Sequence, residues 1–262
     1  MARMILAFLV VVLAAASSAA AQPGGFSERI EADVSSRQIG IESDFAGIQV
    51  VVFGAVDNSQ QRSAEHNFYD IAIVIRGPNE PTVVREKDRV FGVWVNQAAK
   101  TFTEVPQYYA TLSTRPLNEI APEEILAEHN IGYENLEFSR VGGGETDAAS
   151  RQAFRDALIR IKEQQNLYQQ RAFAVAFISR SLFRATVSLP ANVPVGVFDV
   201  EIFLFQNGEL LDTHQTDLRI EKQGLERFIF NLAYEHSLIY GLAGVLIAII
   251  AGLAASAAFR KN

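Results

Sequence analysis

The chain has 262 residues, of which 49% are hydrophobic and 20% charged, which suits one or two folded domains. A net charge of −7 argues against nucleic acid or anionic lipid as the main partner. Because the chain contains no cysteine, disulfides, thiolate metal sites and cysteine nucleophiles are excluded.

The first 21 residues have the layout of a secretory signal peptide. Arg3 precedes an apolar run, and small side chains then lead to an A-x-A pattern that ends at Ala21. We predict cleavage after Ala21, which would leave Gln22 as the first residue of an exported chain. An uncleaved N-terminal anchor is the alternative.

Residues 22–223 read as an exported domain built mainly of β-strands. Strands with one buried face are predicted where apolar and polar side chains alternate, and central strands where the apolar run is continuous. The predicted strands are 27–34, 37–42, 47–54, 67–76, 173–178, 182–189, 197–206, 209–212 and 216–220. Asn207-Gly208 is the strongest short hairpin signal in the chain.

Shorter strand signals lie between these segments. Separate short strands are predicted at 82–85, 91–95, 99–105 and 108–113. Trp94, the only tryptophan, is interpreted as an anchor of the hydrophobic core. The alternative is an exposed platform for a ligand.

A helical insertion is predicted at about 116–172. Pro122, followed by two glutamates, predicts a short helix that ends near Glu128. A longer helix is predicted from Asp147 to about Arg171, because four apolar residues recur at helical spacing. These are Phe154, Leu158, Ile161 and Tyr168. The predicted fold is an immunoglobulin-like β-sandwich with this helical insertion, plus one C-terminal transmembrane helix.

Residues 237–259 carry no charged side chain and are followed by Arg260 and Lys261. At about 1.5 Å per residue, a helix of this length exceeds a hydrocarbon core of roughly 30 Å. We predict a transmembrane helix at 237–259 and a cytoplasmic tail at 260–262, where positive residues are preferred. The lipid bilayer is therefore a predicted partner.

Residues 224–236 are predicted to form an amphipathic juxtamembrane helix. Its apolar face comprises Leu225, Phe228, Ile229 and Leu232. The helix could lie in the membrane interface or extend the membrane helix upward. The extension is favoured, because neither proline nor glycine occurs between Leu225 and Tyr240.

Small side chains recur every four residues in the membrane segment, at Gly244, Ala248, Gly252 and Ser256. Such a row lets two helix backbones approach closely. It predicts a helix-packing face for self-association or for a multispanning membrane partner. The alternative is a chance pattern in a segment rich in alanine and glycine.

No catalytic motif stands out in the sequence. The four histidines lie at scattered positions, and none forms a pair with zinc-ligand spacing. Gly142-Gly143-Gly144 lacks the P-loop pattern, and no G-x-S-x-G motif occurs. We therefore predict no enzymatic activity, no cofactor, no metal site and no nucleic-acid partner.

Several segments resemble a family of alphaproteobacterial transmembrane proteins with a signal peptide, a periplasmic domain and one C-terminal membrane helix. They are Ile39-Gly40-Ile41, Val52-Phe53-Gly54, 189–196 (LPANVPVG) and Gly224 to Phe228 leading into 238–241 (LIYG). The resemblance implies the inner membrane of a Gram-negative cell, with the domain in the periplasm and the C-terminus in the cytoplasm. It also implies a transporter-associated role, because members are often encoded near sulfite-exporter-type permeases. It supplies no catalytic residue.

Three functions follow as hypotheses. The leading one is a periplasmic accessory protein that binds a multispanning inner-membrane transporter. The alternative is a binding or sensing module for a small anion or an envelope component, with an arginine-lined pocket that uses Arg76, Arg85 or Arg184. The third is a hydrolase whose site is assembled from distant residues.

Overall fold

The computed structural model describes residues 28–64, 68–140, 148–223 and 225–259. The predicted signal peptide at 1–21 and the predicted tail at 260–262 lie outside the described residues. So does the triglycine segment that precedes the longest helix of the domain.

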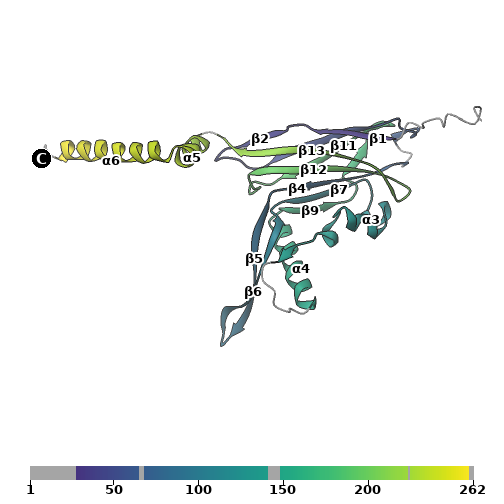
Figure 1. Ribbon diagram of the computed structural model, residues 1–262, viewed down its shortest axis with the longest axis horizontal. Helices are drawn as coiled ribbons and strands as arrows, with labels where there is room; N and C mark the ends of the chain where they lie inside the picture. Colours follow the sequence, from purple (N-terminus) through teal and green to yellow (C-terminus); the bar gives the residue numbers. More distant parts are fainter. Residues whose placement is uncertain (1–27, 65–67, 141–147, 224, 260–262) are drawn as a thin grey trace, which may run out of the picture.

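The described part of the domain contains three sheets (Figure 1). A four-stranded sheet has the order β1 (Arg29–Val34), β3 (Ile48–Asp57), β11 (Leu182–Leu189), β10 (Val175–Phe177). A six-stranded sheet has the order β2 (Gln38–Ile41), β13 (Glu209–Lys222), β12 (Gly196–Gln206), β4 (Asp70–Arg76), β7 (Tyr109–Ser113), β9 (Tyr168–Arg171). The third contains β5 (Asn79–Val90), β6 (Val93–Pro106) and β8 (Ser139–Arg140).

The four-stranded and six-stranded sheets bury their apolar faces in one hydrophobic core. Val52 and Phe183 from the first sheet are fully buried in the same cluster as Ile73 and Phe198 from the second. The two sheets also meet along one side, where the backbone N–H of Ile30 donates to Asp212 Oδ2 at 2.9 Å. Strands β1, β3, β4, β11 and β12 lie where the sequence pattern predicts strands.

The fold is mainly β, as predicted, but the immunoglobulin-like sandwich is not confirmed. The six-stranded sheet contains two parallel pairs, β13 with β2 and β7 with β9. Immunoglobulin-like sandwiches are assembled from antiparallel sheets joined by Greek-key connections. Each parallel pair joins a short edge strand to a strand far away in the sequence. No tight turn connects the two strands, so no local sequence signal predicts their pairing.

Strands β5 and β6 form a long hairpin that projects away from the two larger sheets (Figure 1). The prediction of separate short strands over this region was wrong. So was the core role predicted for Trp94, whose relative exposure is 67%. The base of the hairpin packs on helix α4 (Ala148–Gln164) through a second, smaller core. That core consists of Val84, Phe102, Val105, Phe154 and Leu158.

The helical region contains α2 (Leu117–Ile120), α3 (Glu123–Glu128), a 3-10 turn (Tyr133–Asn135) and α4. Helix α3 confirms the prediction made from Pro122, whereas α2 was not predicted. Helix α4 ends earlier than predicted, because Asn166 adopts a left-handed conformation with φ of 57°. Tyr168 is therefore a buried residue of strand β9, and Ile161 is exposed instead of facing a core.

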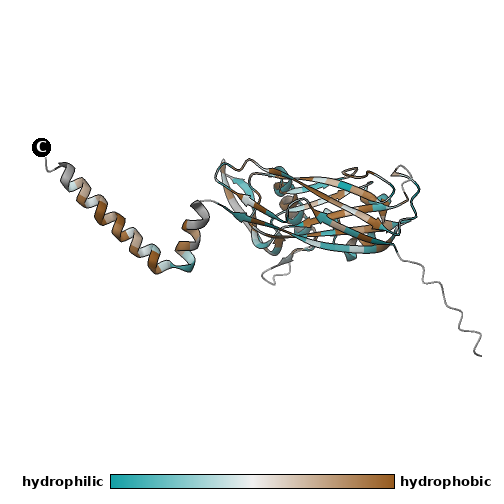
Figure 2. Ribbon diagram, turned by 90° about the horizontal axis from the view of Figure 1, so that it is seen from above, coloured by the Kyte–Doolittle hydropathy of each residue, from teal (hydrophilic) through white to brown (hydrophobic). Residues whose placement is uncertain are grey.

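Two helices end the described chain, α5 (Leu225–Glu235) and α6 (Ser237–Phe259). They are interrupted at His236, and Figure 2 shows that the chain changes direction between them. The prediction that α5 extends the membrane helix was therefore wrong. A straight extension would carry the apolar stripe of α5 away from the membrane, whereas a bend allows the stripe to lie along its surface.

Candidate functional site

A cavity of about 650 Å³ lies beside helices α2 and α3. Its wall comes mostly from residues 113–135, and Gln170 and Ala172 close it from the side of β9. Among the described residues that line it, Glu123 and Glu134 supply carboxylates, and there is no lysine or arginine. Its electrostatics therefore suit a neutral or cationic ligand and disfavour an anion.

Three tyrosine rings pack together beside this cavity, with ring centroids about 6 Å apart: Tyr109, Tyr168 and Tyr133, which also lines the cavity. Burial raises the pKa of each phenol, and nearby Glu163 adds to the rise at Tyr133. Two of the hydroxyls bond to the backbone. Tyr109 accepts from Gly132 N at 2.8 Å, and Tyr168 donates to Pro106 O at 2.8 Å. These neutral phenols stabilise the fold and are poor nucleophiles at neutral pH.

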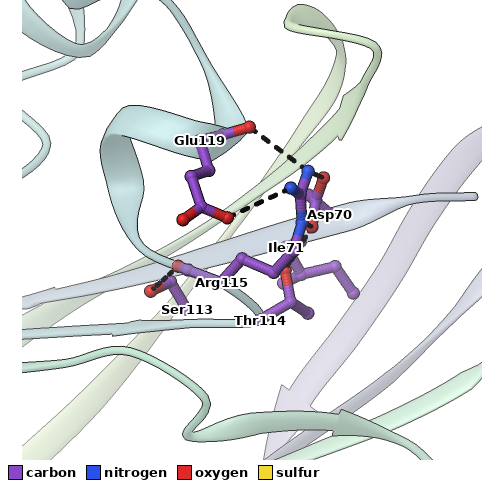
Figure 3. Close-up of polar contacts among 6 residues, drawn as sticks. All are labelled: Asp70, Ile71, Ser113, Thr114, Arg115 and Glu119. Carbon is purple, nitrogen blue, oxygen red and sulfur yellow. Dashed lines mark hydrogen bonds and ion pairs between the residues drawn. The ribbon is translucent and has the colours of Figure 1, made fainter. Parts of the chain in front are cut away.

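A polar cluster joins β4 to the start of α2 (Figure 3). Arg115 donates to Asp70 through two hydrogen bonds, Nε to Oδ1 at 3.0 Å and Nη2 to Oδ2 at 2.5 Å. It also contacts the carboxylate and the backbone carbonyl of Glu119, and Thr114 donates to Asp70 Oδ1 at 2.8 Å. Because both Asp70 oxygens already accept bonds within the protein, the cluster reads as a structural clamp.

The three arginines proposed for an anion pocket do not converge. Arg76 pairs with Glu201 on β12 and donates to the carbonyl of His129 at 2.8 Å. Arg85 and Arg184 are exposed on β5 and β11, which belong to two other sheets. The arginine-lined pocket built from these residues is therefore not formed.

The described residues also bring together no group of histidines, aspartates and glutamates that could hold a metal ion. The ring of His129 packs on Phe203 at 5.3 Å, and His214 is a residue of strand β13. His66 lies outside the described residues.

Lys162 is a buried cation that the sequence pattern did not single out. It lies on α4, and its Nζ donates to Gln107 Oε1 at 2.7 Å. Burial lowers the pKa of its ammonium group, although the carboxylate of Glu80 opposes the change.

A Lys162→Met variant should have a different pH dependence of stability. Where the folded pKa lies below the ordinary value of 10.5, the unfolded state binds more protons. Wild-type stability should therefore rise with pH across that interval, and the methionine variant should lack this rise. Denaturant unfolding at neutral pH and at about pH 10 measures the difference. Equal pH slopes for the two proteins would contradict it.

Helix α6 is long and apolar enough to cross a membrane from Ser237 to Ser256. The predicted packing row is exposed along it. A Cβ added at Gly244 or Gly252 would meet no atom within 4 Å. Ala248 and Ser256 continue the row on the same exposed face.

Helix α5 begins only three residues after the last residue of β13, Lys222. The backbone N–H of Gln223 donates to Ile41 O at 2.8 Å. The hydrogen bonding between β13 and β2 therefore continues one residue beyond Lys222. On α5, Ile229 is exposed and Leu232 is half-buried. The side chains of Leu225 and Phe228 lie outside the described side chains, so the predicted apolar face stays a prediction at these positions.

A protein-family model described as "Putative transmembrane protein (Alph_Pro_TM)" matches residues 29–261. The chain belongs to this family. No curated protein and no solved structure matches the chain. The Alph_Pro_TM match spans the β domain, α5 and α6 together, and it agrees with the one candidate membrane helix found among the described residues.

Sequence reasoning located the membrane helix of this Alph_Pro_TM protein and missed the exposed end of the β5–β6 hairpin. Phe91, Val93, Trp94 and Val95 are all exposed there. A run of apolar residues normally indicates burial, so the pattern predicts a strand at 91–95 and a core position for Trp94. The only available warning was Gly92, which could have marked a tight turn in the middle of the run.

Proposed function

We propose that this Alph_Pro_TM protein is a non-enzymatic accessory protein of the inner membrane. Its β domain would face the periplasm after removal of the signal peptide, and α6 would cross the bilayer. Its partner would be a multispanning membrane protein, with a transporter as the first candidate. The observation that carries the proposal is the short connection between Lys222 and Leu225. It keeps the domain and the membrane helix close enough to engage one partner together.

The row of small residues on α6 supports this proposal. In lipid, helices associate through close packing, because the hydrocarbon tails are as apolar as the side chains. Small residues let a partner backbone approach, and the described domain leaves the Gly244 and Gly252 positions open. The same geometry would also allow a second copy of the chain to bind.

Affinity purification tests the proposal directly. The full chain would be recovered from membranes in mild detergent at native expression, and associated proteins identified by mass spectrometry. A multispanning protein recovered in constant ratio supports the proposal. Recovery of the chain alone, or of its own dimer alone, contradicts the transporter-associated role.

Gly252→Ile should weaken association through α6 by about tenfold or more. A β-branched side chain holds the backbones apart, and overpacking of this kind costs about 1–3 kcal/mol. In-membrane crosslinking yield measures the effect. Ala254→Ile is the matched control, because it adds a similar side chain on the opposite face of the same helix. Equal losses in the two variants would argue against a specific packing face.

A second candidate function is ligand binding in the cavity beside α2 and α3. Its volume and its two carboxylates favour a neutral or cationic envelope component. The residues that line it do not support the binding of an anion. Thermal unfolding of the full chain with cationic and anionic envelope components tests it. Stabilisation by cations that is lost in Glu123→Gln supports this function, and stabilisation by anions contradicts this charge assignment.

A further inference from the structure

The outer part of the β5–β6 hairpin has no covering element within the described protein. Beyond Val84, which packs on α4, the described side chains of β5 are exposed as far as Arg89. The strands continue for about seven residues, which is roughly 20 Å. A free two-stranded hairpin is only marginally stable in water. This projection would therefore gain order from a surface that binds it.

The tip of this hairpin is apolar and aromatic. Phe91 has a relative exposure of 102%, and Trp94 follows at 67% with exposed valines on either side of it. Burial of such apolar side chains is favourable, so leaving them in water forgoes substantial stabilisation. We name Phe91, Gly92, Val93, Trp94 and Val95 the hairpin tip.

The turn at the tip is also unfavourable for the residue that occupies it. Phe91 and Gly92 adopt φ of 48° and 86°, close to the 51° and 90° of Asn207 and Gly208 in the β12–β13 hairpin. Asn-Gly is the preferred pair for this turn, whereas a bulky residue at positive φ is strained. Phenylalanine is thus disfavoured at this position both by the backbone and by exposure to water.

Basic residues share one face of the hairpin with the tryptophan. Arg89 lies directly opposite Trp94, and Lys87 lies opposite Asn96 two positions further along. Residues opposite each other, and residues two apart, point to the same face of the sheet. Asp88 is paired with Val95 and therefore points to the other face. One face of the hairpin is therefore basic and aromatic, and Asp88 lies on the other face. This basic face contrasts with the net negative charge of the chain.

The hairpin tip also lies at the membrane end of the domain. Figure 1 shows it at the same end of the long axis as α5, which leads into the membrane helix. The last strand of the domain, β13, ends at Lys222 on this side as well. Two features far apart in the sequence therefore approach the same surface.

We propose that the hairpin tip inserts into the interface of the same bilayer that α6 crosses. Tryptophan and other aromatic rings are favoured at the level of the lipid headgroups. Lys87 and Arg89 would lie next to them and would interact with anionic headgroups. The domain would then rest on the membrane at two points, α5 and the hairpin tip. This proposal does not depend on any protein partner of α6.

The sole tryptophan makes the proposal directly measurable. The full chain would be placed in lipid nanodiscs with a tryptophan-free scaffold, where both membrane faces are open to solvent, and Trp94 fluorescence recorded. Bromine-labelled acyl chains should quench the emission, the emission maximum should shift to shorter wavelength, and acrylamide should quench poorly. A tip that is quenched freely by acrylamide and not by brominated lipid would overturn the proposal.

Phe91→Asn is the informative variant, because it installs the turn pair that the chain already uses at Asn207-Gly208. The hairpin should remain folded, and lipid quenching of Trp94 should fall. Phe173→Asn is the matched control. Phe173 is another exposed phenylalanine at positive φ, on the connection from β9 to β10, and its replacement should leave the quenching unchanged. Equal losses of quenching in both variants would overturn the proposal.

Charge provides the second arm of the experiment. In nanodiscs with anionic lipid, replacing Lys87 or Arg89 with glutamine should lower the ratio of inserted to free tips about fivefold for each charge removed. In purely zwitterionic nanodiscs the same substitutions should have little effect. A Trp94 that stays exposed in nanodiscs and becomes shielded only in complexes purified from native membranes would identify a protein-binding surface and refute insertion into lipid.

Discussion

Gly54→Ala should lower the free energy of unfolding by about 3 kcal/mol, at the upper end of the usual cost of overpacking. Gly54 lies in the middle of β3, between Ala32 on β1 and Phe183 on β11. An added Cβ would lie 2.4 Å from the backbone oxygen of Glu31 and 2.6 Å from Phe183 Cζ. The oxygen cannot rotate away, so β1 itself must move.

Two measurements distinguish this mechanism from general destabilisation. Denaturant unfolding, followed by the near-ultraviolet circular dichroism of the tyrosines, gives the loss of stability. Hydrogen exchange should show the largest loss of protection in β1, which pairs with β3 along its whole length. Gln49→Ala, at an exposed position of the same strand, serves as the control. A variant as stable as this control would refute the clash.

Arg115→Ala should lower the free energy of unfolding by about 2–3 kcal/mol, somewhat less than the 3–5 kcal/mol typical of a fully buried pair. The side chain of Asp70 is only 8% exposed, and without Arg115 its carboxylate would keep Thr114 as its one side-chain donor. Arg115 is 36% exposed, so water would enter its place in the variant and replace part of the hydrogen bonding to Asp70. Denaturant unfolding near neutral pH measures the change.

The chain supplies a matched comparison for that experiment. Arg37 makes the same two-bond contact with Asp33, at 3.1 and 3.0 Å, but its side chain is 66% exposed. Exposed pairs typically contribute about 0.2–1 kcal/mol, so Arg37→Ala should have a small effect. If the two arginine variants lost equal stability, burial of Asp70 would not be the cause.

Local patterns predicted those parts of the fold that depend on local interactions. Alternating side chains located β11 to the residue, and Asn207-Gly208 located the turn between β12 and β13. The equivalent turn at Phe91-Gly92 was missed, because phenylalanine carries no turn signal. The early end of α4 was missed for a related reason. The apolar spacing continues to Tyr168, and only the left-handed backbone at Asn166 shows that the helix has already ended.

The membrane helix is the part of the candidate site that composition alone predicts. A run such as 237–259 indicates a membrane helix without any tertiary information. The direction of α5 relative to α6 was not predictable, because it depends on which surface its apolar stripe meets. The exposure of Trp94 and the burial of Lys162 were likewise hidden, because each residue lies in a tertiary environment opposite to the usual one for its type.

The pairing of β13 determines how the domain would respond to mechanical force. Lys222 is paired in parallel with Ile41 on one side, and β12 pairs with most of β13 on the other. A pull from the membrane helix would enter the domain along the axis of β13. Because the ladder hydrogen bonds run perpendicular to the strands, many of them would be loaded in shear at once. Such a strand resists extraction far better than one that is peeled open bond by bond. The pairing of β13 therefore predicts that the domain resists tension from its own anchor.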